Sequence, residues 1–111
     1  MLIITSENVA GHKTVATLGM VRGATVRAKH VGTDIVAGLK SIVGGELGGY
    51  SSLMAGAREQ ALDRMVEDAE RLGANAIVSM RLQTSAIAKG ASEIVAYGTA
   101  VRIVPMDETQ K

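Results

Sequence analysis

Hydrophobic side chains recur every three or four residues between Ser52 and Leu72, and charged side chains fill many of the positions between them. The hydrophobic positions are Met54, Ala57, Ala61, Leu62, Met65, Val66, Ala69 and Leu72. This spacing predicts an amphipathic helix with one hydrophobic stripe, ~32 Å long at ~1.5 Å per residue. We expect the stripe to pack on the core and the charged side to face water.

Signals at both ends of this segment support the helix. The hydroxyl of Ser51 or Ser52 can accept a hydrogen bond from a free N–H group of the first turn, and Gly73 fits a left-handed C-terminal cap. Two pairs of opposite charge stand four residues apart and are predicted to form ion pairs on the charged side: Arg64–Asp68 and Glu67–Arg71.

Alternation of hydrophobic and polar residues predicts strands on both sides of the helix. In one of them Ala24, Val26 and Ala28 alternate with polar residues, so we expect these three on its buried face. Gly19 and Gly23 predict a bend or a bulge. The predicted strands are Leu2–Thr5, Val15–Arg22, Ala24–Lys29, Asn75–Thr84 and Glu93–Val104, with a turn at Asn8–Lys13 and a connection at Ser85–Ser92.

The last predicted strand, Glu93–Val104, is hydrophobic on both faces. One face carries Val95, Tyr97, Thr99, Val101 and Ile103, and the other carries Ile94, Ala96, Gly98, Ala100, Arg102 and Val104. Such a strand is typical of a sheet that is covered on both sides. One long helix covers one face, so the second needs another subunit or a short helix, which the pattern of Ile35–Val43 predicts after a cap at Asp34.

The core must be built without large aromatic residues. The chain of 111 residues has no Phe or Trp, although 47% of it is hydrophobic. We interpret it as a single domain over residues 1–105, followed by a tail of residues 106–111 beyond Pro105. Because small side chains bury little area each, at about 25 cal/mol per Å², we expect association with further copies to bury more.

Charge and hydropathy exclude several classes of partner. The chain has 12 basic and 11 acidic side chains without a block of like charge, so no clustered basic surface for nucleic acid is predicted. No hydrophobic stretch approaches the ~20 residues that span a bilayer, and the first residues carry no charged leader. We therefore expect a cytoplasmic protein with neither a nucleic acid nor a membrane as partner.

The segment from Gly44 to Tyr50 holds four of the 13 glycines, and a glycine-rich loop that opens a helix can hold a phosphate. A P-loop needs Lys and then Ser or Thr after its last glycine, whereas Tyr50 follows Gly49 here. Glu46 would also place negative charge beside the phosphate. We interpret the segment as a joint between two helices, and an enzyme or binding protein that holds a phosphorylated small molecule at Gly44–Gly49 is the less favoured alternative.

Metal ligands are few. His12 and His30 are the only histidines, and Asp34 follows His30 by four residues, a spacing that shares a face only in a helix. We treat His12, His30 and Asp34 as candidate metal ligands, against the simpler interpretation that they are surface residues near turns. The six Met residues are better explained as core gap-fillers than as Cu(I) ligands, and the absence of Cys excludes thiolate sites.

No pattern that activates a nucleophile, such as Gly-x-Ser-x-Gly, occurs in the chain. We therefore predict no catalytic residue, and a metal ion is the one candidate cofactor. Glu46, Tyr50 and Arg58 could converge near the glycine segment as ligand or interface residues, although packing and capping explain them more simply.

Five motifs, taken in order, resemble the YbjQ family: Leu18-Gly19-Met20-Val21, Val43-Gly44-Gly45-Glu46-Leu47-Gly48-Gly49-Tyr50, Ala57-Arg58-Glu59-Gln60-Ala61-Leu62, Leu72-Gly73-Ala74-Asn75-Ala76-Ile77-Val78 and Tyr97-Gly98-Thr99-Ala100-Val101. This is a family of small bacterial proteins of uncharacterised function that are often labelled "putative heavy-metal-binding". The resemblance covers nearly the whole chain. It implies an α+β, dodecin-like fold, in which a small antiparallel sheet packs on one long helix plus a short helix, and it implies a homopentamer.

The sequence and the resemblance together predict a non-enzymatic homopentamer that binds a small ligand or an ion at its subunit interfaces. The alternative is a soft- or heavy-metal-binding protein with histidine and exposed Met ligands. The metal label itself finds little support in a chain without Cys or a ligand cluster.

Overall fold

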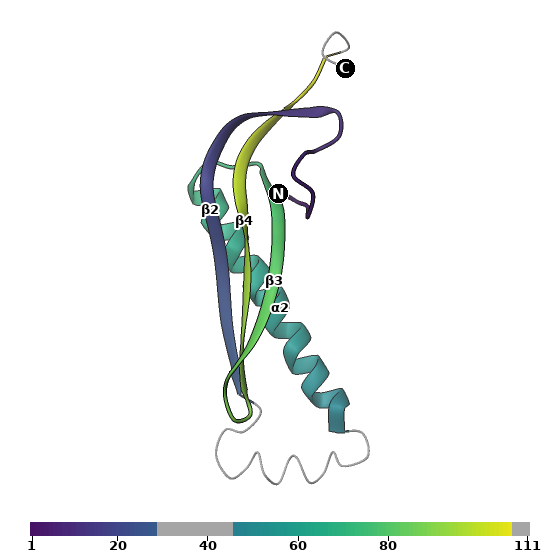
Figure 1. Ribbon diagram of the computed structural model, residues 1–111, viewed down its shortest axis with the longest axis vertical. Coiled ribbons are helices and arrows are strands. Elements are labelled where there is room, and N and C mark those ends of the chain that lie inside the picture. Colours follow the sequence, from purple (N-terminus) through teal and green to yellow (C-terminus); the bar gives the residue numbers. More distant parts are fainter. Residues whose placement is uncertain (29–45, 108–111) are drawn as a thin grey trace.

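A computed structural model describes residues 1–28 and 46–107, which form a sheet packed on one long helix (Figure 1). The elements are strands β1 (Leu2–Ile3), β2 (His12–Ala28), β3 (Ala76–Ala88) and β4 (Ala91–Pro105) and helix α2 (Glu46–Arg71). The strand order is β1-β3-β4-β2, and only β1 and β3 are parallel. The predicted α+β fold is confirmed, with a sheet that is mixed rather than purely antiparallel. The predicted short helix at Ile35–Val43 lies outside the described residues.

Helix α2 begins earlier than predicted. Its 26 residues start at Glu46 and span ~39 Å at ~1.5 Å per residue. The prediction that Ser51 or Ser52 caps its start is therefore wrong, as is the interpretation of Glu46–Tyr50 as a turn. Glycine inside a helix costs only about 1 kcal/mol relative to alanine, which a long helix tolerates. The preceding glycine, Gly45, lies outside the described residues.

The end of α2 matches the prediction. Gly73 has φ +82°, its N–H donates to the Glu70 carbonyl at 3.0 Å, and the Ala74 N–H donates to the Ala69 carbonyl at 3.1 Å. These two bonds form a Schellman cap, which requires the left-handed conformation at Gly73. Leu72 lies beyond the last helical residue and is 45% exposed, so it does not continue the hydrophobic stripe.

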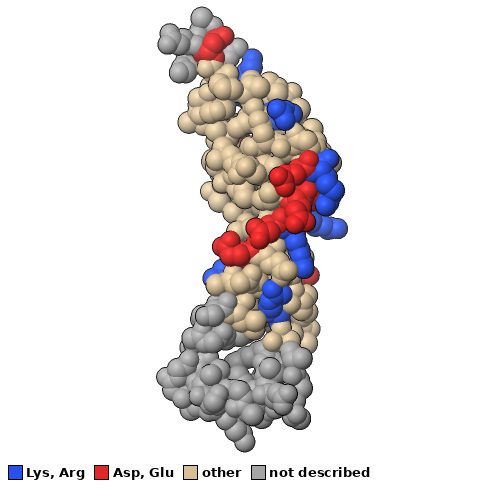
Figure 2. Space-filling model, turned by 180° about the vertical axis from the view of Figure 1, so that it is seen from behind, with Lys and Arg blue, Asp and Glu red and all other residues tan. Residues whose placement is uncertain are grey.

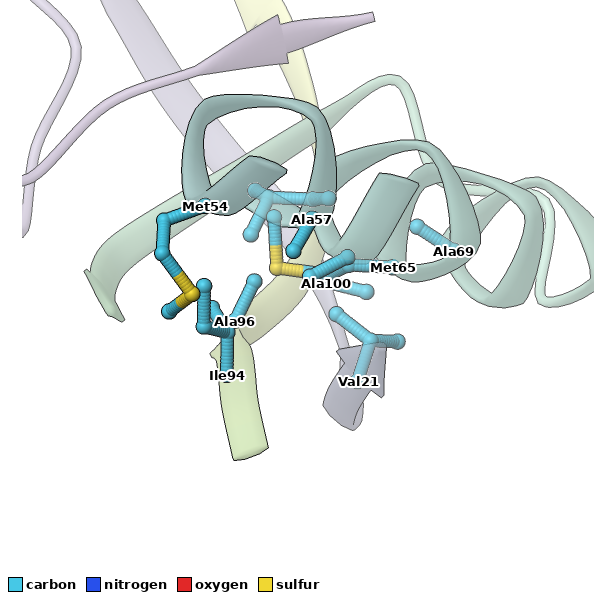
Figure 3. Packing of buried hydrophobic residues seen from close by; sticks show 10 residues of the cluster. Val21, Met54, Ala57, Met65, Ala69, Ile94, Ala96 and Ala100 are labelled. Carbon is cyan, nitrogen blue, oxygen red and sulfur yellow. The ribbon is translucent and has the colours of Figure 1, made fainter. Parts of the chain in front are cut away.

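The hydrophobic stripe of α2 packs on one face of the sheet, here called the closed face (Figure 3). Met65 and Ala61 are fully buried, as are Val21 of β2 and Ala100 of β4. The predicted stripe is therefore confirmed. The cluster consists of Val21, Met54, Ala57, Ala61, Met65, Ala69, Ile77, Ile94, Ala96 and Ala100.

Gly23 is the position where β2 and α2 come closest. A Cβ atom on Gly23 would lie 2.1 Å from the Ala61 carbonyl oxygen and 2.5 Å from the Met65 nitrogen. Both are main-chain atoms, so only glycine fits. The predicted break at Gly23 is wrong, because β2 continues through it. The irregularity lies at Gly19, which has φ +124° at a register shift.

The two faces of β2 are reversed from the prediction. Thr25 is 2% exposed and its hydroxyl donates to the Ala57 carbonyl at 2.9 Å, whereas Val26 is 52% exposed. The expectation that Ala24, Val26 and Ala28 face the core is therefore wrong. Gly23 and Thr25 lie on the same side of the strand. The missing side chain of Gly23 and the small one of Thr25 allow the helix to approach that side.

Two side chains of α2 form hydrogen bonds with main-chain groups at the outer edge of β2. Arg64 Nη1 donates to the Ala24 carbonyl at 2.6 Å, and the Arg22 N–H donates to Asp68 Oδ2 at 3.3 Å. Asp68 also pairs with Arg71 at 2.9 Å. Within the described part of the chain neither predicted i,i+4 ion pair forms, because Arg64 and Asp68 bond to the strand and Arg71 pairs with Asp68 rather than with Glu67.

The exposed charged side chains of α2 form a diagonal band over the back of the molecule (Figure 2). The band mixes both signs and is exposed, as predicted for the outer side of the helix. The exposed charged residues of α2 are Arg58, Glu59, Asp63, Arg64, Glu67, Glu70 and Arg71.

Strands β3 and β4 form a longer hairpin than predicted. The connection expected at Ser85–Ser92 is wrong, because β3 runs to Ala88 and Ala88 pairs directly with Ala91. Gly90 supplies φ +75° in the short turn between them.

We expect Gly23→Ala to lower the free energy of unfolding by about 3 kcal/mol, because the new methyl group would overlap main-chain atoms of α2. Gly56→Ala is the matched control in the same helix, where no atom lies within 4 Å of the added Cβ, and it should raise that free energy by up to about 1 kcal/mol. Urea denaturation followed by circular dichroism measures both. Equal stability of Gly23→Ala and the wild type would contradict the close approach.

Candidate ligand site on the open sheet face

The sheet has a second face, here called the open face, which points away from α2. Alternation along β4 turns Ile94 and Ala96 toward the helix and Val95 and Tyr97 away from it, which matches the predicted division of these residues between two faces. The pairing registers extend this face to the neighbouring strands. Away from its end at Ala76, Val101 and Ile103, it consists of Met20, Arg22, Ala24, Val26, Val78, Arg81, Gln83, Glu93, Val95, Tyr97 and Thr99.

The N-terminal segment covers only one end of the open face. Ile4 and Val9 pack there on a buried cluster of Ala76, Val78, Val101 and Ile103. Beyond that end Met20 is 66% exposed, and Val95 and Tyr97 are half-buried. The prediction that both faces of β4 are covered therefore holds on the helix side from Ile94 to Ala100, and it holds only in part on the open face in the described part of the chain.

Three residues form a row across the open face. Tyr97 of β4 pairs with Arg22 of β2 on one side and with Arg81 of β3 on the other. Residues paired directly across strands point to the same face of a sheet. Two guanidinium groups therefore flank one phenol ring. We call Arg22, Tyr97 and Arg81 the arginine row.

A bulge in β3 turns Arg81 to the open face. Val78 pairs with Thr99 and Arg81 with Tyr97, so β3 has one residue more than β4 between these pairs. One extra residue reverses which side chains face which way beyond it. Strict alternation along the predicted strand Asn75–Thr84 would put Arg81 on the opposite face from Val78, and the bulge, which the alternation does not reveal, reverses this.

The bulge is held by main-chain hydrogen bonds. Ser79 has φ +55°, the one left-handed non-glycine residue in the described part of the chain. Its N–H donates to the Ser6 carbonyl at 2.9 Å, and the Met80 N–H donates to the Ile4 carbonyl at 3.0 Å. A left-handed serine costs on the order of 1 kcal/mol or more and persists only where its surroundings fix it. The N-terminal segment therefore fixes the conformation that presents Arg81.

The two arginines of the row are held differently. Arg81 Nη1 donates to the carbonyls of Thr5 at 3.0 Å and Met80 at 2.8 Å. The guanidinium of Arg22 makes no hydrogen bond or ion pair within the described part of the chain, since its contact with Asp68 uses the main-chain N–H. The row thus offers several N–H donors and one phenol, a set suited to an oxyanion and unsuited to a metal cation.

Two of the residues predicted as candidates are described and lie far apart. His12 opens β2, where its Nδ1 lies 2.9 Å from the Ala10 carbonyl oxygen. Arg58 is exposed on α2, next to the Ala57 carbonyl that Thr25 contacts. The strand between His12 and Thr25 spans roughly 40 Å at ~3.3 Å per residue, so these candidates do not form one site.

The other candidates cannot be placed as side chains. His30 and Asp34 lie outside the described residues. Glu46 and Tyr50 belong to the first turns of α2, and their side chains also lie outside the described part. Among the residues that the structure describes, no three His, Asp or Glu side chains lie together as a metal site would require. Nor does any described helix combine the length and the hydrophobicity needed to cross a membrane.

Sequence reasoning missed the arginine row. The pattern correctly placed Tyr97 on the opposite face of β4 from Ile94 and Ala96. Its two neighbours in the row come from strands about 75 and 16 residues away in the chain, a pairing that single-strand periodicity does not specify. The one available signal was Tyr97 itself, an aromatic side chain in a chain with two tyrosines and no Phe or Trp.

Comparison with known proteins places the chain beside a family without an assigned activity. Residues 1–104 match the family model YbjQ_1, described as "Putative heavy-metal-binding". A UPF0145 protein of Methanosarcina acetivorans is 55% identical over 104 residues, which are 94% of this chain and 98% of that protein. A UPF0145 protein of Clostridioides difficile is 55% identical over 101 residues, covering 91% and 90% of the two chains.

A solved structure shares the fold at low sequence identity. It is a protein of unknown function from Pediococcus pentosaceus, assigned to the DUF74 family. The TM-score is 0.61 at 15% identity, with 94% of this chain and 98% of that chain covered. This likeness supports the fold and carries no information about ligands.

We expect Arg81→Met to speed amide hydrogen exchange of Ile4 and Met80 by about tenfold, because it removes the hydrogen bond from Arg81 Nη1 to the Thr5 carbonyl that ties the N-terminal segment to β3. Arg22→Met is the control from the other side of the row and should leave these amides unchanged. Exchange followed by NMR measures both. Unchanged exchange in Arg81→Met would show that Arg81 does not hold the segment.

Proposed function

Because this chain belongs to the YbjQ family of UPF0145 proteins, we propose that it is a non-enzymatic homopentamer that binds a small ligand or an ion at its subunit interfaces. We place the protein in the cytoplasm by the same proposal, with further copies of itself as its partner.

The open face is the observation that carries the proposal. The closed face is buried under α2, whereas Met20 and Val26 on the open face expose large hydrophobic side chains beside Val95 and Tyr97. A β-sheet is most stable when its hydrophobic faces are covered. A core without Phe or Trp also buries less area than usual, so a second copy over the open face would add hydrophobic burial where the single chain has least.

A five-membered ring needs a heterologous contact, in which one surface meets a different surface of the next copy. This chain offers two unlike surfaces, since the open face carries Met20 and the two arginines, while the outer side of α2 carries the charged band. Successive copies would then bring residues from two chains to each interface, which is where we propose that the ligand binds. The number five follows from the family resemblance.

We expect the wild-type protein to run at about 57 kDa in native mass spectrometry, five times the 11.5 kDa chain. Met20→Asp combined with Val26→Asp should shift it to the monomer, because each copy would bury unpaired carboxylates at a cost of several kcal/mol. Leu72→Asp, an exposed leucine next to the end of α2 and away from the open face, is the control and should leave the oligomer intact.

An 11.5 kDa wild-type protein at micromolar concentration would refute the oligomer. An oligomer that survives both aspartates on the open face would move the interface elsewhere on the molecule.

Metal binding is the second candidate function, and the family description "Putative heavy-metal-binding" favours it. Within the described residues His12 belongs to no group of three or more side chains that could hold a metal ion. A metal site would therefore use His30 and Asp34, or it would use side chains from several copies around the ring axis.

We expect calorimetric titration of tag-free protein with Zn²⁺, Cu²⁺, Ni²⁺ and Cd²⁺ to show no saturable binding, since the chain lacks thiolates and a described ligand cluster. Saturable binding that His30→Ala or His12→Ala abolishes would establish the metal hypothesis instead. Arg58→Ala is the control for nonspecific effects.

A further inference from the structure

We propose that the arginine row binds a small oxyanion of the phosphate type, either inorganic phosphate or the phosphate group of a small metabolite. The guanidinium groups of Arg22 and Arg81 supply charge and hydrogen bonds, and the hydroxyl of Tyr97 supplies a further donor. The proposal names the ligand class of the interface site put forward above, and it rests on that proposal only for the idea that another copy covers the face.

The first argument is uncompensated charge. Two cations stand on either side of one phenol ring, and neither forms an ion pair in the described part of the chain. The neighbouring pairs on the open face carry no carboxylate either. They are Met20, Thr99 and Val78 on one side, and Ala24, Val95 and Gln83 on the other. The two arginines stand two strand spacings apart, roughly 10 Å, so an anion above Tyr97 would be attracted by both.

The second argument is preorganisation. The two hydrogen bonds that hold Arg81 both use Nη1, which fixes the group while the described residues leave its remaining N–H donors unused. The bulge that presents Arg81 includes Ser79 in a left-handed conformation. Strained backbone conformations of this kind cluster at active sites and ligand-binding sites. Arg81 is thus set in place before any ligand arrives, whereas the Arg22 guanidinium has no partner among the described residues.

The third argument is desolvation. Hydrophobic side chains flank the row on both sides, at Met20 and Val95. A copy that covers them also takes water from the guanidinium groups, and a buried charge needs a partner. A carboxylate has two oxygens and can satisfy one guanidinium fork. A phosphate-type anion has enough oxygens to accept from both forks and from the phenol, so it fits the row better.

The arginine row is a different location from the phosphate site considered at Gly44–Gly49. Gly48 and Gly49 lie within α2, where glycine supplies no loop around an anion. The row lies on the other side of the sheet from α2, so variants of the row and of the helix separate the two locations cleanly.

The test is titration of the full, tag-free chain with inorganic phosphate in phosphate-free buffer, followed by isothermal calorimetry and ³¹P NMR. We expect saturable binding in the wild type, binding weakened about tenfold or more in Arg22→Gln, and unchanged binding in Lys89→Gln, an exposed cation in the turn between β3 and β4. Tyr97→Phe should weaken binding less. Sulfate should compete, whereas chloride at equal ionic strength should not.

Four outcomes overturn the proposal. The first is no saturable binding up to about 10 mM phosphate, which is weaker than a functional site requires. The second is equal loss in Arg22→Gln and Lys89→Gln, which would indicate general charge attraction. The third is unchanged binding in Arg22→Gln. The fourth is dissociation of the oligomer by Arg22→Gln without phosphate binding in the wild type, which would show that Arg22 meets a carboxylate of the next copy.

Native mass spectrometry of the same samples separates this proposal from the proposed function. A monomer that binds phosphate through Arg22 supports the site and contradicts the pentamer. An oligomer that binds no phosphate supports the assembly and contradicts the site. Titration with a phosphorylated metabolite and with its dephosphorylated form then distinguishes free phosphate from a larger ligand.

Discussion

The contact between Gly23 and the backbone of α2 is the constraint on which the rest of the structure depends. It brings strand and helix to a distance that only a missing side chain permits. At that distance the Thr25 hydroxyl reaches the Ala57 carbonyl, and Arg64 and Asp68 reach the main chain of β2. The same contact fixes which face of β2 is covered, and it thereby leaves the other face open.

Periodicity within one element was enough to predict the hydrophobic stripe of α2 and the two faces of β4, because both depend on local geometry. The reversal of Thr25 and Val26 was not predictable in this way, since it depends on which side of the strand the helix approaches. The start of α2 was missed for a different reason. Gly48 and Gly49 favour a turn locally, and the long helix overrides that preference.

The candidate site was less predictable than the fold, because its residues come from three strands and from a bulge. Arg81 faces the same way as Tyr97 only because β3 carries one extra residue at Ser79 and Met80. Close relatives at 55% identity identify the family, while the structural neighbour at 15% identity shows that the fold tolerates extensive sequence change. Fold and family therefore say little about the ligand, and the argument for the arginine row rests on side chains of this chain.

The hydrogen bonds of Arg64 and Asp68 to β2 have a consequence for growth of the sheet. A sheet lengthens into a ribbon when each molecule offers a free edge on both sides. Here a strand added along β2 would find the Arg22 N–H and the Ala24 carbonyl already bonded, so its pairing would be interrupted midway. Edge-to-edge stacking is thus blocked on one side, and filaments built through that edge are disfavoured even in a chain rich in β-structure.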